Sequence, residues 1–180
     1  MKKVVWFGAV AALLLGCSER PDPSVVPEPF ELIIAHINDT HSAFDPVPAS
    51  FRANELTVYN EFGGHPRLLE QANAYRAIAE EENTAMLFLH GGDAWQGSAY
   101  FKINEGRMNA DILSRMNIDA MALGNHEFDL TNAHLNEFLT RINFPLLAAN
   151  IDTSRDPDLK DQDNLRAYTL FAFDGYQKQR

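Results

Sequence analysis

Carboxylate, amide and imidazole side chains gather in three short segments of this 180-residue sequence. The first contains Asp39 and His41, the second contains Asp93 after two glycines, and the third contains Asn125 and His126. A mixed set of oxygen and imidazole donors suits Zn, Mn or Fe, and suits Mg less well where histidines dominate. Two such ions about 3.5–4 Å apart can activate a bridging water and neutralise a phosphoryl group during in-line attack.

Each of the three segments follows a short apolar run that is typical of a buried strand. The sequence predicts these strands over residues 32–37, 85–89 and 118–123, and it predicts two later strands over 146–149 and 168–173. In open α/β sheets, ligands bind beyond the carboxyl ends of the strands. We therefore expect the polar side chains of the three segments to converge on one rim of a sheet.

Segments with a helical spacing of apolar residues separate the predicted strands. Pro66 suits the first turn of one helix, and Thr131 is placed to cap another. Between them, a further helix is expected to bury Met108, Ile112 and Met116. The helix after Thr131 is expected to bury Leu135, Phe138, Leu139 and Ile142. This alternation predicts an α/β fold with a largely parallel sheet and helices on its faces.

The composition is that of an ordinary globular protein of about one domain, with 46% hydrophobic and 22% charged residues. The formal net charge is −10. An acidic chain repels phosphate backbones, so we expect no nucleic acid polymer as a partner. An anionic substrate would need a local reversal of charge, which bound metal ions usually supply.

The N-terminus has the pattern of a bacterial export signal. Lys2 and Lys3 precede an apolar run over residues 4–15, which is too short for a membrane-spanning helix of about 20 residues. Residues 14–17 read LLGC, as in a lipobox where cleavage precedes a lipid-modified cysteine. Cys17 is the only cysteine, so the chain cannot form an internal disulfide. The alternative is a plain secretory signal with an incidental cysteine.

The sequence thus divides into three parts. Residues 1–16 are expected to be a lipoprotein signal peptide, residues 17–30 a proline-rich tether, and residues 31–180 the α/β domain. The tether contains Pro21, Pro23, Pro27 and Pro29, a spacing that favours extended chain over helix. This organisation predicts an exported protein in the periplasm or at the cell surface, held to a membrane through lipid on Cys17.

Several strings in the three segments resemble the calcineurin-like metallophosphoesterase superfamily. The ordered set is Asp39-x-His41, Gly92-Asp93 and Gly124-Asn125-His126-Glu127. Longer strings look like the secreted bacterial 5'-nucleotidase branch: INDTHS at 37–42, GDAWQGS at 92–98, ALGNHEFD at 122–129 and LAAN at 147–150. The resemblance covers residues 32–173 and corresponds to the N-terminal part of the family's fold.

The resemblance implies a role for each polar residue of the rim. Asp39 and His41 would bind a first divalent metal ion, Asp93 would bridge two ions, and Asn125 would bind the second. The complete family site holds two such ions, for example Zn, Mn or Mg.

Two further residues match the catalytic pair of the family. His126 would contact the phosphate and stabilise charge or protonate the leaving oxygen, and Asp129 would orient it. A carboxylate partner would hold the tautomer of this histidine and favour its protonated form. The implied activity is metal-dependent hydrolysis of nucleotide phosphate esters, by a protein expected to be a monomer.

The sequence departs from the family pattern in its last third. Members need later histidines, including a Gly-His-x-His segment, whereas no histidine follows His134. We therefore expect a catalytic domain that is incomplete at its C-terminus, with activity expected of the full-length form. The alternatives are an inactive metal-binding truncated remnant, or a related phosphoesterase such as a 2',3'-cyclic nucleotide phosphodiesterase or a UDP-sugar hydrolase.

Overall fold

The computed structural model describes residues 30–174 and 177–178. Its central sheet has five strands in the order β1-β4-β5-β6-β7, and every pairing in it is parallel. The strands are β1 (Leu32–Ile37), β4 (Ala85–His90), β5 (Ala120–Ala122), β6 (Leu146–Leu147) and β7 (Leu165–Arg166). The predicted α/β class with a parallel sheet is thereby confirmed.

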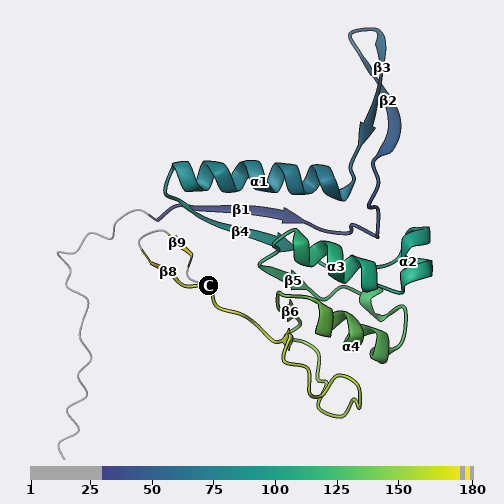
Figure 1. The fold of residues 1–180 in the computed structure, drawn as a ribbon, viewed down its shortest axis with the longest axis vertical. Coiled ribbons are helices and arrows are strands. Elements are labelled where there is room, and N and C mark those ends of the chain that lie inside the picture. Colours follow the sequence, from purple (N-terminus) through teal and green to yellow (C-terminus); the bar gives the residue numbers. More distant parts are fainter. Residues whose placement is uncertain (1–29, 175–176, 179–180) are drawn as a thin grey trace, which may run out of the picture.

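Four α-helices and one short 3-10 helix accompany this sheet in the described part of the chain. They are α1 (His65–Glu81), α2 (Ala99–Asn104), α3 (Arg107–Arg115), η1 (His126–Phe128) and α4 (Asn132–Arg141). Helix α1 lies along β1 and β4, while α3 packs beside α4 (Figure 1). None of the described helices is both long and apolar enough to cross a membrane.

The core lies where α3 and α4 meet the sheet. The four apolar positions predicted to be buried in α4 are all at most 4% exposed, and they pack in one cluster with Leu113, Met116, Met121 and Leu146. Thr131 occupies the N-cap position as predicted, but its hydroxyl contacts His134 Nδ1 at 2.7 Å instead of a backbone N–H. Packing of its buried face therefore stabilises this helix more than the N-cap residue does.

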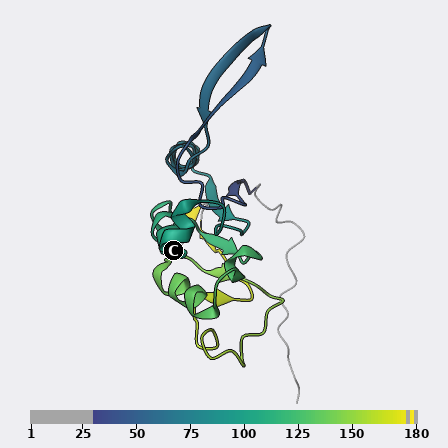
Figure 2. The same ribbon diagram turned by 90° about the vertical axis from the view of Figure 1, so that its right-hand side faces the viewer.

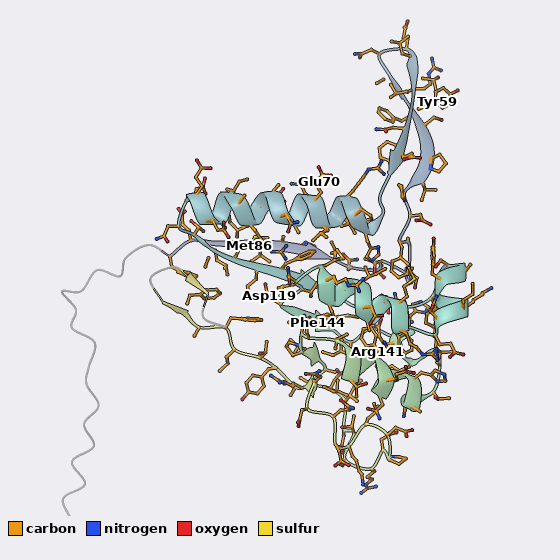
Figure 3. The ribbon with its side chains drawn as sticks, in the orientation of Figure 1. Tyr59, Glu70, Met86, Asp119, Arg141 and Phe144 are labelled. Carbon is orange, nitrogen blue, oxygen red and sulfur yellow. The ribbon has the colours of Figure 1, made fainter. Side chains whose placement is uncertain are left out.

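A β-hairpin between the first strand and the first helix was not predicted. Strands β2 (Val47–Ala53) and β3 (Leu56–Phe62) pair antiparallel, and every residue in them is exposed. Figure 2 shows the hairpin projecting away from the rest of the protein, and Tyr59 lies on it (Figure 3). Apolar residues alternate with other residues along β2, at Val47, Ala49, Phe51 and Ala53, so the strand pattern is present although every residue of the hairpin is exposed.

The predicted strand over residues 168–173 is wrong in its position. The fifth strand of the sheet is β7, which ends at Arg166, before this segment begins, and pairs with β6. Tyr168 and Leu170 are exposed, so their apolar character does not reflect burial in a sheet. Further on, β8 (Phe173–Asp174) pairs antiparallel with β9 (Gln177–Lys178).

The predicted signal peptide over 1–16 and nearly all of the tether over 17–30 lie outside the described residues. Both remain predictions.

Candidate metal centre

Three loops at the carboxyl ends of β1, β4 and β5 form the predicted rim. The loops after β1 and β4 continue to pair beyond the strands, through Asp39 N to Gly92 O at 3.0 Å and His41 N to Asp93 O at 3.2 Å. The loop after β5 joins them, because His126 N donates to Asp93 Oδ1 at 2.9 Å. The convergence expected from the order of strands is therefore present.

Three side chains of this rim face a common point. Ligand atoms of His41, Asp93 and His126 all lie within 4.8 Å of one another. Asp39 is adjacent, with its Oδ1 atom 3.8 Å from His41 Nε2. Two imidazoles and two carboxylates at these separations form a donor set that fits a divalent transition metal. The three-residue cluster unites two predicted ligands with the predicted catalytic histidine.

The tautomer of His41 follows from its backbone partner. His41 Nδ1 lies 2.9 Å from the carbonyl oxygen of Trp95, which can only accept a hydrogen bond. The proton is therefore on Nδ1, and Nε2 keeps the free lone pair that a metal ligand needs. Trp95 itself is completely buried, so its side chain anchors the loop that carries this carbonyl in the core.

The ligand-bearing loops have an unusual backbone. Asp39, His41 and Asp93 all have positive φ angles, at 51°, 44° and 57°. Such conformations are costly for residues with a side chain, and they cluster at functional sites. Gly124 allows the loops to approach closely, because a Cβ atom there would collide with the Asp93 carboxylate.

His126 and Asp129 form a hydrogen-bonded pair at the edge of the cluster. His126 Nδ1 lies 2.6 Å from Asp129 Oδ2, and both side chains are partly exposed. The hydrogen bond to Asp129 raises the pKa of His126. The same bond, together with a second one from the Gln96 side chain, lowers the pKa of Asp129. The pairing expected from the sequence is therefore present, with Gln96 as an additional partner.

Asn125 lies exposed at the start of η1, directly before His126. Its sequence position places it on the same rim as Asp93, since the next backbone N–H binds the Asp93 carboxylate. The rings of His41 and His126 meet edge to face, with centroids 5.0 Å apart. All six predicted site residues thus belong to the three loops.

Glu127 is the main residue whose role sequence reasoning missed. Its side chain is 0% exposed. One oxygen accepts from Ala94 N at 2.8 Å and Trp95 N at 3.3 Å. The other accepts from Asp93 N at 3.1 Å and Gly124 N at 2.8 Å. Burial raises the pKa of the Glu127 carboxyl, and these four N–H donors oppose that effect.

His90, at the end of β4, also connects two of the loops. Its Nδ1 accepts from Gly92 N at 3.0 Å, so the proton is on Nε2, which lies 3.1 Å from Thr40 Oγ1. Its side chain is buried, and burial is the main cause that lowers its pKa to about 4. His90 therefore ties the first loop to the second while staying neutral. The sequence left two roles open for this histidine, a place behind the metal ligands or packing and backbone hydrogen bonding, and the second was favoured.

Known proteins are similar to this chain in sequence and in fold. Residues 32–178 match the model of the calcineurin-like phosphoesterase family. The probable 5'-nucleotidase of Treponema pallidum is 34% identical over 149 residues, which are 83% of this chain and 24% of that protein. The NAD 5'-nucleotidase of Haemophilus influenzae is 32% identical over 145 residues, covering 81% of this chain and 23% of that protein.

Two solved structures agree with this assignment. The 5'-nucleotidase precursor from Thermus thermophilus superposes with a TM-score of 0.68 at 33% identity, covering 82% of this chain and 27% of that one. The NAD nucleotidase of Haemophilus influenzae also gives a TM-score of 0.68, at 31% identity, covering 79% of this chain and 24% of that one. The chain spans less than a third of the length of each of these relatives. With its parallel sheet and its rim of carboxylate and imidazole side chains, the chain belongs to the calcineurin-like phosphoesterase family.

Proposed function

We propose that this rim supplies part of a site for two divalent metal ions in the full-length form of the protein, and that this form hydrolyses nucleotide phosphate monoesters as a 5'-nucleotidase. The observation that carries the proposal is the close approach of ligand atoms from His41, Asp93 and His126, within 4.8 Å of one another. Asp39 and His41 would hold the first ion, Asp93 would bridge, and Asn125 would hold the second. When bound, the ions supply an activated water and positive charge for the phosphoryl group.

His126 is proposed to act on the phosphate and the leaving oxygen. Its Nδ1 proton is committed to Asp129, so Nε2 is the atom that would meet the substrate. Asp129 favours the protonated imidazole, which can stabilise negative charge or donate a proton. Asp129 therefore acts through His126, and Gln96 acts through Asp129.

The nucleotide is proposed as the substrate because several relatives are named for it. They include the probable 5'-nucleotidase of Treponema pallidum, the NAD 5'-nucleotidase of Haemophilus influenzae and the snake venom 5'-nucleotidase of Crotalus adamanteus. The acidic chain also fits a small anionic substrate better than a nucleic acid polymer, because only the metal ions would reverse the local charge.

The test is phosphate release from adenosine monophosphate by the full-length form. We expect hydrolysis in the presence of Mn²⁺ or Zn²⁺, loss of activity in EDTA, and recovery when metal is restored. Parallel assays with a 2',3'-cyclic nucleotide and with UDP-glucose compare the related phosphoesterase classes. Activity that persists in EDTA would contradict metal dependence, and a preference for either alternative substrate would contradict the 5'-nucleotidase assignment.

Export and lipid attachment are proposed from the LLGC string at residues 14–17. Relatives named as a precursor and as venom proteins support export. Cells grown with labelled fatty acid should incorporate the label into the wild-type protein. Cys17→Ser should abolish labelling and leave the protein as an uncleaved precursor or release it from membranes. Unchanged membrane attachment of this variant would contradict the lipid anchor.

A further inference from the structure

Glu127 joins two of the three loops and is not part of the cluster of His41, Asp93 and His126. Its two carboxylate oxygens accept four backbone N–H groups, three from residues 93–95 after β4 and one from Gly124 after β5. It is completely buried. A buried carboxylate is costly unless its charge is compensated. The four N–H donors compensate this charge.

Asp93, His126 and Glu127 form a closed ring of hydrogen bonds and chain bonds that includes the Asp93 carboxylate. Glu127 Oε2 accepts from both Asp93 N and Gly124 N, so a single atom sets the separation of the two loops. Asp93 Oδ1 in turn accepts from His126 N, and His126 is bonded to Glu127 along the chain. The orientation of Asp93 is therefore fixed by Glu127 on one side and by His126 on the other.

We propose that Glu127 is a positioning residue that fixes the Asp93 carboxylate against the loop of Asn125 and His126, and so sets the geometry of the metal centre. This inference rests on the proposed metal site and adds a residue to it. Glu127 acts through the backbone of the loops, since its four contacts are to the main-chain N–H groups of Asp93, of the two residues after it and of Gly124. Partners of this kind, behind the ligands, typically change metal affinity by about 10- to 100-fold.

Two variants separate the shape of the side chain from its charge. Glu127→Gln keeps the shape, but its amide can accept at one end only and presents N–H donors to the other pair of backbone donors. Glu127→Asp keeps the carboxylate, but it is one methylene shorter and cannot span both loops. Leu139→Ala is the stability control, because Leu139 is completely buried in α4 and is not one of the proposed site residues.

The experiment is a titration of the metal-free 180-residue chain with Co²⁺, followed by visible absorption, together with thermal unfolding of each variant. We expect both Glu127 variants to bind Co²⁺ roughly 10- to 100-fold more weakly and to show an altered absorption spectrum. Leu139→Ala should lose stability and keep the wild-type affinity and spectrum. If Glu127→Gln does not fold, Glu127→Asp carries the comparison.

The inference is overturned if the folded Glu127 variants lose stability like the Leu139 control and bind Co²⁺ with wild-type affinity and spectrum. In that case Glu127 only stabilises the fold. A wild-type chain that binds no Co²⁺ at all would contradict a different claim, the proposed metal centre itself.

Discussion

The Nδ1 atom of His126 lies 2.6 Å from the Oδ2 atom of Asp129, three residues further along the chain. Since a carboxylate accepts, the imidazole proton is on Nδ1, and Nε2 is left for the cluster that His126 forms with His41 and Asp93. One short bond therefore sets the tautomer of His126 and raises its pKa. Mutation of this pair can therefore separate metal binding from the acid–base role proposed for His126.

In the full-length form, His126→Ala should lower the turnover of a nucleoside monophosphate by about 10²- to 10⁴-fold, the usual contribution of a positioned acid–base group. Asp129→Asn should cause a smaller loss, because it weakens orientation and charge without removing the imidazole. Metal content, measured by mass spectrometry of the elements, should be nearly unchanged in both variants. If His126→Ala instead loses a metal ion in proportion to its activity, His126 is a ligand and not an acid–base group.

Gly97 should be essential to the position of His41. Its φ angle is +83°, and an added Cβ atom would lie 2.6 Å from the His41 carbonyl oxygen and 2.8 Å from the His41 Cβ. Gly97→Ala should therefore displace His41, lowering both the free energy of unfolding and the affinity for Zn²⁺. Chemical denaturation and a competition titration with a chromogenic chelator measure the two effects.

Gly63→Ala is the matched control for this substitution. Gly63 also has a positive φ angle, at +70°, but no heavy atom lies within 4 Å of an added Cβ. Gly63→Ala should lower the free energy of unfolding only by the cost of the left-handed backbone conformation, about 1–2 kcal/mol, and should leave Zn²⁺ affinity unchanged. Equal Zn²⁺ affinities for the two variants would show that contact with Gly97 does not position His41.

The buried His90 should make stability depend on pH in the acidic range. Its pKa is lowered to about 4 in the folded chain, against about 6.5 in an unfolded one. Between these values the unfolded chain binds a proton at this site and the folded chain does not. The free energy of unfolding should therefore fall as pH decreases from 6.5 through 4, by up to about 3 kcal/mol from this group.

Urea denaturation of the metal-free chain at several pH values measures this slope. His90→Gln should flatten the slope between pH 6.5 and 4, because the group that takes up the proton on unfolding is gone. His36→Gln, which removes an exposed histidine of β1, is the control and should keep the wild-type slope. A His90→Gln variant with the wild-type slope would assign the acid sensitivity to other groups, among them His65, whose pKa burial also lowers.

Most of the fold could be predicted because buried strands leave short apolar runs in the sequence and buried helix faces leave a periodic spacing of apolar residues. The first two strands of the parallel sheet were predicted over Leu32–Ile37 and 85–89, and the structure places them at Leu32–Ile37 and Ala85–His90. The hairpin of β2 and β3 was not predicted, although apolar residues alternate along β2, because the prolines in this stretch argue against a central strand. The segment over 168–173 gave a false one, because Tyr168 and Leu170 are apolar yet exposed.

The site could be predicted in part for a different reason. Asp39, His41 and Asp93 follow strands directly, so the order of elements alone brings them together. The contribution of Glu127 could not be derived in this way, because its partners are backbone N–H groups of loops that meet only in the folded chain. The same holds for the Trp95 carbonyl, whose bond to His41 joins residues 54 positions apart.

The most direct test of the account is native mass spectrometry of the 180-residue chain after addition of Zn²⁺ and removal of the excess. With His41, Asp93 and their neighbours in place but no histidine after His134, the wild-type chain should retain one tightly bound ion. Asp93→Ala, which removes the central carboxylate, should retain none. A wild-type chain that holds no ion, or an Asp93→Ala chain that holds as much as the wild type, would contradict a metal centre at this rim.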